Sequence, residues 1–108
     1  MPEINEIIPG LWLGSRPRVS TISKLQLKGI KAIVTVDVQP LPNREFSCFK
    51  LLFIHASDYP FVELIRSFEN AIRFIEENVE SGVLVHWYAY HSVVNLLLAL
   101  LVCLEALQ

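Results

Sequence analysis

The clearest pattern of apolar and polar positions lies between residues 61 and 79. Apolar side chains recur there at alternating intervals of four and three residues, and charged side chains fill most of the positions between them. This spacing places the apolar residues on one stripe of a helix and the charged residues on the other side. We therefore predict a long amphipathic helix that ends at Ser81-Gly82, with an apolar stripe made of Phe61, Ile65, Phe68, Ile72, Ile75 and Val79.

Shorter apolar runs lie on both sides of this helix. Residues 30–38, 49–54 and 83–85 are rich in apolar side chains, many of them β-branched, and this is typical of buried strands. Near the N-terminus, Pro9-Gly10 separates two more short apolar runs, and a Pro-Gly pair favours a turn between strands. A short helix is expected after them, with Ser20 or Thr21 as its cap and Gly29 at its end.

The order of these elements predicts the fold class. Strands and helices alternate along the chain, which favours an α/β fold with a central, mostly parallel sheet of about four or five strands and helices on both faces. The 108 residues suit one small domain, and they contain no internal repeat and no linker. We therefore predict a single domain over residues 1–108.

An uncharged stretch near the C-terminus has two interpretations. Residues 82–104 contain no Asp, Glu, Lys or Arg, and these 23 residues are long enough to span a bilayer. The segment 83–85 fits a buried strand better, and residues 93–107 fit a helix that is apolar on nearly every side. We favour burial in the core, and a membrane location through this helix stays open. Polar residues interrupt the stretch at His86, His91, Ser92 and Asn95.

Composition and charge narrow the classes of partner. Hydrophobic residues make up 53% of the chain and charged residues 19%, which excludes disorder. The net charge is −2 without any run of Lys or Arg, so nucleic acid is not the expected partner. The polar N-terminus is no signal peptide, and Cys48 and Cys103 have no metal-ligand spacing. We expect a cytoplasmic protein with reduced thiols, no metal and no cofactor, and a nuclear location stays open.

The segment from residue 83 to 104 is the candidate site. A strand that enters a tight loop and then a helix directs backbone N–H groups and the positive helix end at one point, where an anion can bind. Its sequence, Val83-Leu84-Val85-His86-Trp87-Tyr88-Ala89-Tyr90-His91-Ser92-Val93-Val94, resembles the signature of the dual-specificity protein phosphatases, V-x-V-H-C-x-A-G-x-S-R-S. That family lies within the cysteine-dependent protein tyrosine phosphatases. His86, Ala89 and Ser92 match the signature.

Two other segments and one acid extend the resemblance to roughly residues 4–107. Residues 8–14 are similar to the family's opening I-x-x-x-L-Y-L-G, and residues 27–36 to its L-x-x-x-G-I-T-x-V-L-N-V segment. Asp58 stands at the family's general-acid position. The resemblance implies a protein tyrosine phosphatase-like fold and phosphoester hydrolysis. It also implies that the chain lacks the last helices of the family.

Three replaced positions predict an inactive loop. Trp87 stands at the position of the nucleophilic Cys, Tyr90 at the Gly that allows the backbone to curl, and Val93 at the phosphate-binding Arg. An indole N–H is a donor and no nucleophile, and an aliphatic side chain cannot grip two phosphate oxygens. We therefore expect Asp58 to be idle as an acid. The phosphate-loop positions are His86, Trp87, Tyr88, Ala89, Tyr90, His91, Ser92 and Val93.

Structural roles compete with catalytic ones at these positions. Asp58 fits a helix-start cap, and Ser92 fits a cap for the helix that follows it. His86 is expected to be buried and bonded to nearby backbone. We expect the aromatic residues of the loop, Trp87, Tyr88 and Tyr90, to pack into the vacated pocket, and an aromatic binding patch is the alternative.

Three functional hypotheses follow. The first is a pseudophosphatase that binds a protein partner, with a phosphoprotein as one option. The second is an active tyrosine and serine/threonine phosphatase, or a variant of one. The third is a truncated, membrane-associated product whose apolar C-terminal helix is exposed.

Overall fold

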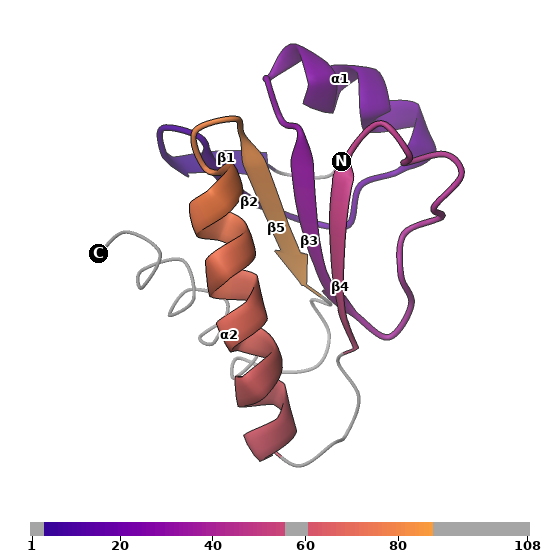
Figure 1. Ribbon diagram of the computed structural model, residues 1–108. Coiled ribbons are helices and arrows are strands. Elements are labelled where there is room, and N and C mark those ends of the chain that lie inside the picture. Colours follow the sequence, from indigo (N-terminus) through magenta and orange to yellow (C-terminus); the bar gives the residue numbers. More distant parts are fainter. Residues whose placement is uncertain (1–3, 56–60, 88–108) are drawn as a thin grey trace.

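A computed structural model of the chain describes residues 4–55 and 61–87 (Figure 1). The elements follow one another as β1 (Ile4–Ile8), β2 (Leu11–Gly14), the 3-10 helix η1 (Val19–Thr21), α1 (Ile22–Leu27), β3 (Ala32–Asp37), β4 (Lys50–His55), α2 (Phe61–Asn78) and β5 (Val83–Trp87).

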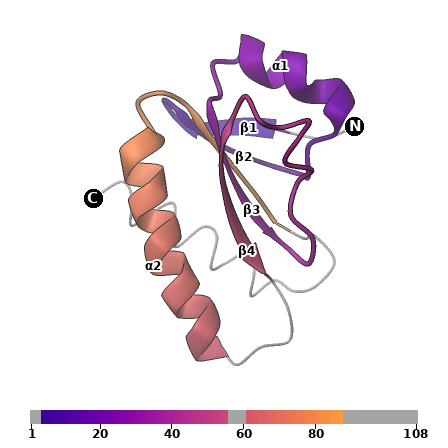
Figure 2. The same ribbon diagram turned by 45° about the vertical axis from the view of Figure 1, so that its right-hand side comes forward.

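The strands form one five-stranded sheet in the order β1-β2-β5-β3-β4. The four strands β2, β5, β3 and β4 run parallel, and β1 pairs antiparallel with β2 at one edge. Helix α2 lies on one face and α1 on the opposite face (Figures 1 and 2). The predicted fold class, a mostly parallel sheet with helices on both faces, is confirmed.

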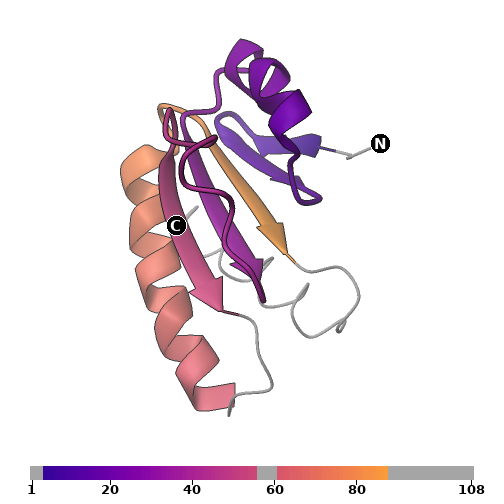
Figure 3. The same ribbon diagram turned by 90° about the vertical axis from the view of Figure 1, so that its right-hand side faces the viewer.

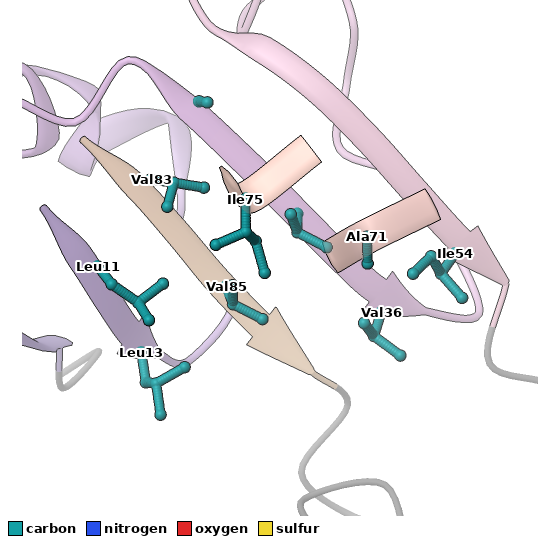
Figure 4. Packing of buried hydrophobic residues seen from close by; sticks show 10 residues of the cluster. Leu11, Leu13, Val36, Ile54, Ala71, Ile75, Val83 and Val85 are labelled. Carbon is teal, nitrogen blue, oxygen red and sulfur yellow. The ribbon is translucent and has the colours of Figure 1, made fainter. Parts of the chain in front are cut away.

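The core beneath α2 arises from the alternation of side chains along the strands. Every second residue of a strand faces the same side of the sheet. Ala71 and Ile75 of α2 contribute to a buried cluster on that side (Figure 4). The strand residues of the cluster are Leu11, Leu13, Ala32, Val34, Val36, Ile54, Val83 and Val85.

A second core lies on the α1 side of the sheet. Leu25 of α1 packs there with Ile33 of β3 and Leu84 of β5, the residues that alternate with the first cluster. The segment between β3 and β4 completes this core with Leu41, Phe46 and Phe49. All six residues of β3 are buried, as expected for a central strand covered on both faces.

The long amphipathic helix is confirmed as α2, from Phe61 to Asn78. Ile72 and Val79 of the predicted stripe pack against the core, and Ile75 is fully buried. Glu69, Arg73, Glu76 and Glu77 on the other side are exposed.

Gly82 joins α2 to β5 in a conformation that favours glycine. Its φ is +107°, and a Cβ atom there would lie 2.2 Å from the carbonyl oxygen of Gly29. The carbonyl oxygen of Gly82 accepts from the N–H groups of Lys31 (2.9 Å) and Ala32 (3.1 Å). This close approach fixes the turn after α2 against the start of β3. The helix itself ends at Asn78, earlier than the predicted Ser81-Gly82, because the N–H groups of Ser81 and Gly82 both donate to the carbonyl of Asn78 and close a turn there.

Two local predictions need correction. Thr21 does not cap α1 with its side chain, because its hydroxyl donates to the carbonyl of Arg18 (2.7 Å) and accepts from the N–H of Arg18 (3.1 Å). The last strand continues beyond Val85 to Trp87, since β2 pairs with it as far as His86 and β3 as far as Trp87.

Several predictions concern residues outside the described ranges. The apolar helix at 93–107, Cys103 and the loop residues after Trp87 belong to this group, as does Asp58. Cys48 lies in the segment between β3 and β4, and its thiol is free and exposed. Neither of the α-helices in residues 4–55 and 61–87 combines the length and apolar character that crossing a membrane requires.

Candidate functional site

The carboxyl ends of the four parallel strands lie together at one end of the sheet. Gly14, Asp37, His55 and Trp87 are their last residues. In α/β sheets, ligands bind in the crevice outside the carboxyl ends of the strands. The middle strand β5 carries the predicted loop, and β2 and β3 flank it on the two sides (Figure 1).

His86 is held within the sheet near the carboxyl end of β5. It pairs in register with Gly14 of β2 and Thr35 of β3, and its side chain is fully buried. Its Nε2 atom lies 2.8 Å from the hydroxyl oxygen of Thr35. Its Nδ1 atom is also buried and has no hydrogen-bond partner among the residues that the structure describes.

The predicted burial of His86 is confirmed, but the partner is different. We expected a bond to nearby backbone, whereas the bond goes to a side chain on the neighbouring strand. The parallel register between β3 and β5 places Thr35 beside His86 on the same face of the sheet. Sequence reasoning missed Thr35, because a Thr in a β-branched strand gives no signal apart from its strand propensity.

The pKa of the His86 imidazole falls from 6.5 to about 3. Burial is the largest cause, because it removes water from the charged form. The positive charge of Arg16 lowers the pKa further, and the negative charge of Asp37 acts in the opposite direction. At neutral pH the ring is therefore uncharged, so it can exchange hydrogen bonds but cannot attract an anion by its charge.

Arg16 and Asp37 form an ion pair next to this histidine. Nη1 of Arg16 donates to Oδ2 of Asp37 at 2.8 Å and to the carbonyl of Gln39 at 2.8 Å. Its Nη2 donates to the carbonyl of Pro40 at 2.8 Å, and Oδ1 of Asp37 accepts from the N–H of Val38 at 2.6 Å. The guanidinium thus ties the segment after β2 to the segment after β3.

Sequence reasoning also missed this ion pair. Asp37 was available as a signal, since it is an acidic residue at the end of an otherwise apolar run. The Asp37 side chain is only 5% exposed, and a buried carboxylate requires a cationic or hydrogen-bonding partner. Arg16 could not be chosen from the sequence, because its contact depends on how β2 and β3 flank β5.

Of the predicted site residues, His86 and the backbone of Trp87 lie in the part of the chain that the structure describes. Trp87 ends β5, where it pairs in register with Val36 directly after the buried His86. Nothing is described of the Trp87 side chain, of Asp58, or of the loop positions from Tyr88 to Val93. The assignment of Trp87, Tyr90 and Val93 to the catalytic positions therefore stays a prediction.

The fold is that of the protein tyrosine phosphatase-like proteins. The human tyrosine phosphatase-like serine/threonine/tyrosine-interacting protein superposes with a TM-score of 0.70 and 27% identity, over 96% of this chain and 74% of that one. A probable dual specificity protein phosphatase of Dictyostelium discoideum is 33% identical over 92 residues, which are 82% of this chain and 22% of that protein. Dual specificity protein phosphatase 12 of mouse is 34% identical over 88 residues, which are 78% of this chain and 26% of that protein.

The chain belongs to the dual-specificity protein phosphatase family, as its sequence resemblance indicated. It spans about a quarter of the length of the curated relatives named above. A comparison with models of known protein families finds no match.

Proposed function

We propose that this chain is a catalytically inactive member of its family, a pseudophosphatase that acts by binding a protein. The observation that carries the proposal is the sequence at the end of β5, where Trp87 follows the buried His86. In the family signature, the residue after this histidine is the cysteine that attacks phosphorus. Indole has no lone pair available for that attack.

The size of the expected loss follows from how such residues cooperate. Removing one member of a catalytic set lowers the rate by roughly 10⁴- to 10⁶-fold. Val93 also replaces the Arg that would hold two phosphate oxygens, and aliphatic carbon provides no donor. Both changes act on the same step, so we expect no measurable phosphatase activity.

The charges of His86 and Arg16, near the carboxyl ends of the parallel strands, support binding that does not depend on phosphate. His86 is neutral at physiological pH because its pKa is about 3. Arg16 is a cation, but three of its five N–H donors bond to Asp37, Gln39 and Pro40. A phosphate that displaced the bond to Asp37 would leave a buried carboxylate without its partner.

One similar protein supports a binding role. The human relative in the structural comparison is called a tyrosine phosphatase-like interacting protein, and this chain is 27% identical to it. The names of the curated relatives favour the alternative, an active protein phosphatase. We propose a cytoplasmic location, whether the chain binds a protein or is an active phosphatase.

A peptide titration separates phosphate-dependent from phosphate-independent binding. A phosphotyrosine peptide and its unphosphorylated twin are titrated into the chain, with an active family member in which the nucleophile is replaced by Ser as the positive control. We expect the control to prefer the phosphorylated peptide and this chain to show no preference. A clear preference of this chain for the phosphopeptide would overturn the phosphate-independent part of the proposal.

A further inference from the structure

Strand β4 forms one edge of the sheet. Among the strands of residues 4–55 and 61–87, β3 is its only neighbour. Figure 3 is turned so that β4 is the strand nearest the viewer. Along a strand, successive residues direct their backbone N–H and C=O groups to opposite sides, so every second residue of β4 directs both groups away from β3.

One hydrogen bond identifies the residues that point outward. The N–H of Lys50 donates to the carbonyl of Lys31 at 2.9 Å, just before β3 begins. The backbone N–H and C=O groups of Lys50 therefore point toward β3, and the alternation gives the same direction to the backbone groups of Leu52 and Ile54. Leu51 and Phe53 direct their backbone groups outward, and none of the backbone hydrogen bonds made by the turns and loops of residues 4–55 and 61–87 goes to those groups.

The two edges of the sheet differ in how they are protected. At the far edge, β1 carries the exposed Glu6, and its register with β2 shifts between Glu6 and Ile8. Such charges and irregularities prevent a sheet edge from pairing with another chain. β4 keeps a regular register with β3 over its whole length and has four consecutive uncharged residues, Leu51, Leu52, Phe53 and Ile54.

Phe53 adds an exposed aromatic ring to this edge. It is 37% exposed, and its ring contacts that of His55 edge-on at a centroid distance of 6.0 Å. An exposed aromatic side chain on an edge strand gains stability when a cross-strand neighbour covers it, and aromatic pairs are among the favourable neighbours.

We propose that two copies of this chain pair antiparallel through β4 to form one continuous sheet. The two-fold axis passes beside Phe53, which exchanges N–H···O=C bonds with the partner's Phe53. The two rings then lie on the same face of the sheet, as directly opposite residues do. Lys50, the only Lys or Arg of β4, falls at the end of the paired stretch, so no lysine side chains meet at its centre.

The strand is a better complement to itself than to a charged peptide. Its four central residues offer no charge that a partner of opposite sign could neutralise. A two-fold arrangement matches apolar residues with apolar residues and needs only one surface, as in most homodimers. Because edge pairing buries a modest area, we expect a reversible dimer whose population depends on concentration.

Sedimentation velocity over a range from low micromolar to several hundred micromolar tests the proposal. We expect a monomer–dimer equilibrium for the wild-type chain. Phe53→Lys places two ammonium groups at the axis and should raise the dimer dissociation constant by at least about tenfold. Leu27→Lys is the matched control, because Leu27 is 86% exposed on α1 and the same change there should leave the constant unaltered.

A covalent trap serves if Phe53→Lys fails to fold. In a hydrogen-bonded antiparallel pair the Cα atoms are about 5.5 Å apart, within the range of a disulfide. Diamide takes one hydrogen from each of two thiols and leaves an S–S bond, so peptide mapping of Phe53→Cys should find a disulfide between the introduced thiols of the two copies. The experiment uses a Cys48→Ser background, since Cys48 is exposed, and Leu27→Cys as the control.

Three results would overturn the proposed dimer. The wild-type chain could stay monomeric at every concentration, Phe53→Lys could leave the dissociation constant unchanged, or Leu27→Lys could weaken the dimer equally. None of these results bears on the proposed loss of catalysis, because β4 pairing involves no residue of the phosphate loop.

Discussion

Thr35 and His86 meet between two neighbouring strands, with the hydroxyl oxygen of Thr35 2.8 Å from Nε2 of His86. Both residues are buried, and they pair in register across β3 and β5. The contact anchors the end of β5 on the α1 side of the sheet, directly before Trp87. It thereby defines where the predicted phosphate loop leaves the sheet.

Replacing Thr35 with Val tests this contact. Valine keeps the shape of the side chain but leaves the Nε2 atom of a buried His86 without its observed partner. We expect the free energy of unfolding to fall by about 1–3 kcal/mol, the usual cost of such a group. Urea denaturation measures it, and Thr35→Ser, which keeps the hydroxyl, is the control. A Val variant that is at least as stable as the Ser variant would contradict the importance of the bond.

The lowered pKa of His86 predicts a pH dependence of stability. The folded-state pKa is about 3 and the ordinary value is 6.5, so the unfolded chain binds more protons between these two values. Stability therefore rises with pH in that window and loses this contribution as the pH falls below 6.5, by up to about 1.4 kcal/mol per pH unit. Above pH 6.5 the contribution is constant.

Comparison with His86→Gln isolates this contribution, because glutamine does not titrate. The unfolding free energies of both proteins are measured from pH 7.5 down to the lowest pH at which both fold. We expect the wild-type curve to be steeper below pH 6.5. Parallel curves would show that His86 titrates normally in the folded state.

The ion pair between Arg16 and Asp37 predicts the effect of removing the guanidinium. Arg16→Gln leaves a buried carboxylate and two carbonyls without their charged donor. The Arg16 side chain is 36% exposed, so solvent screens part of the loss, and we expect a destabilisation of about 1–2 kcal/mol. Thermal unfolding at low and high salt measures it. Arg73→Gln on the exposed side of α2 is the control, and equal effects of the two changes would contradict a special role for Arg16.

Gly82 and Gly29 provide a matched pair of glycine substitutions. Both have positive φ, +107° and +83°, but only Gly82 has backbone within 4 Å of the site of a Cβ atom. Gly29→Ala should cost about 1 kcal/mol through backbone strain alone, and Gly82→Ala clearly more, because the Gly29 carbonyl must also move. Chemical denaturation measures both. A Gly82→Ala variant as stable as Gly29→Ala would show that the junction between α2 and β3 yields easily.

The fold class can be predicted from the sequence, because the patterns that identify each helix and strand lie within that segment. The stripe of α2 and the β-branched run of β3 each follow from side-chain periodicity, and their alternation defines an α/β sheet. Gly82 marks the turn that follows α2, although the helix itself ends at Asn78. The length of β5 was underestimated, because the pairing of His86 with Gly14 and Thr35 is a property of the sheet and not of the segment.

The sequence predicts the site residues that lie within one segment, but not the contacts that the site makes between different strands. The resemblance identified the strand that carries the loop, and the burial of His86 followed from it. The contacts across the sheet, Thr35 with His86 and Arg16 with Asp37, join residues 51 and 21 positions apart. No periodicity encodes such pairs, because they depend on strand order.

The central claim is that Trp87 and Val93 leave this chain without phosphatase activity. Hydrolysis of a small aryl phosphate by the purified chain, measured beside an active dual-specificity phosphatase at equal concentration, tests it most directly. We predict a turnover at least about 10⁴-fold below that of the active enzyme. Turnover comparable to that enzyme, and abolished by Asp58→Ala, would contradict the claim.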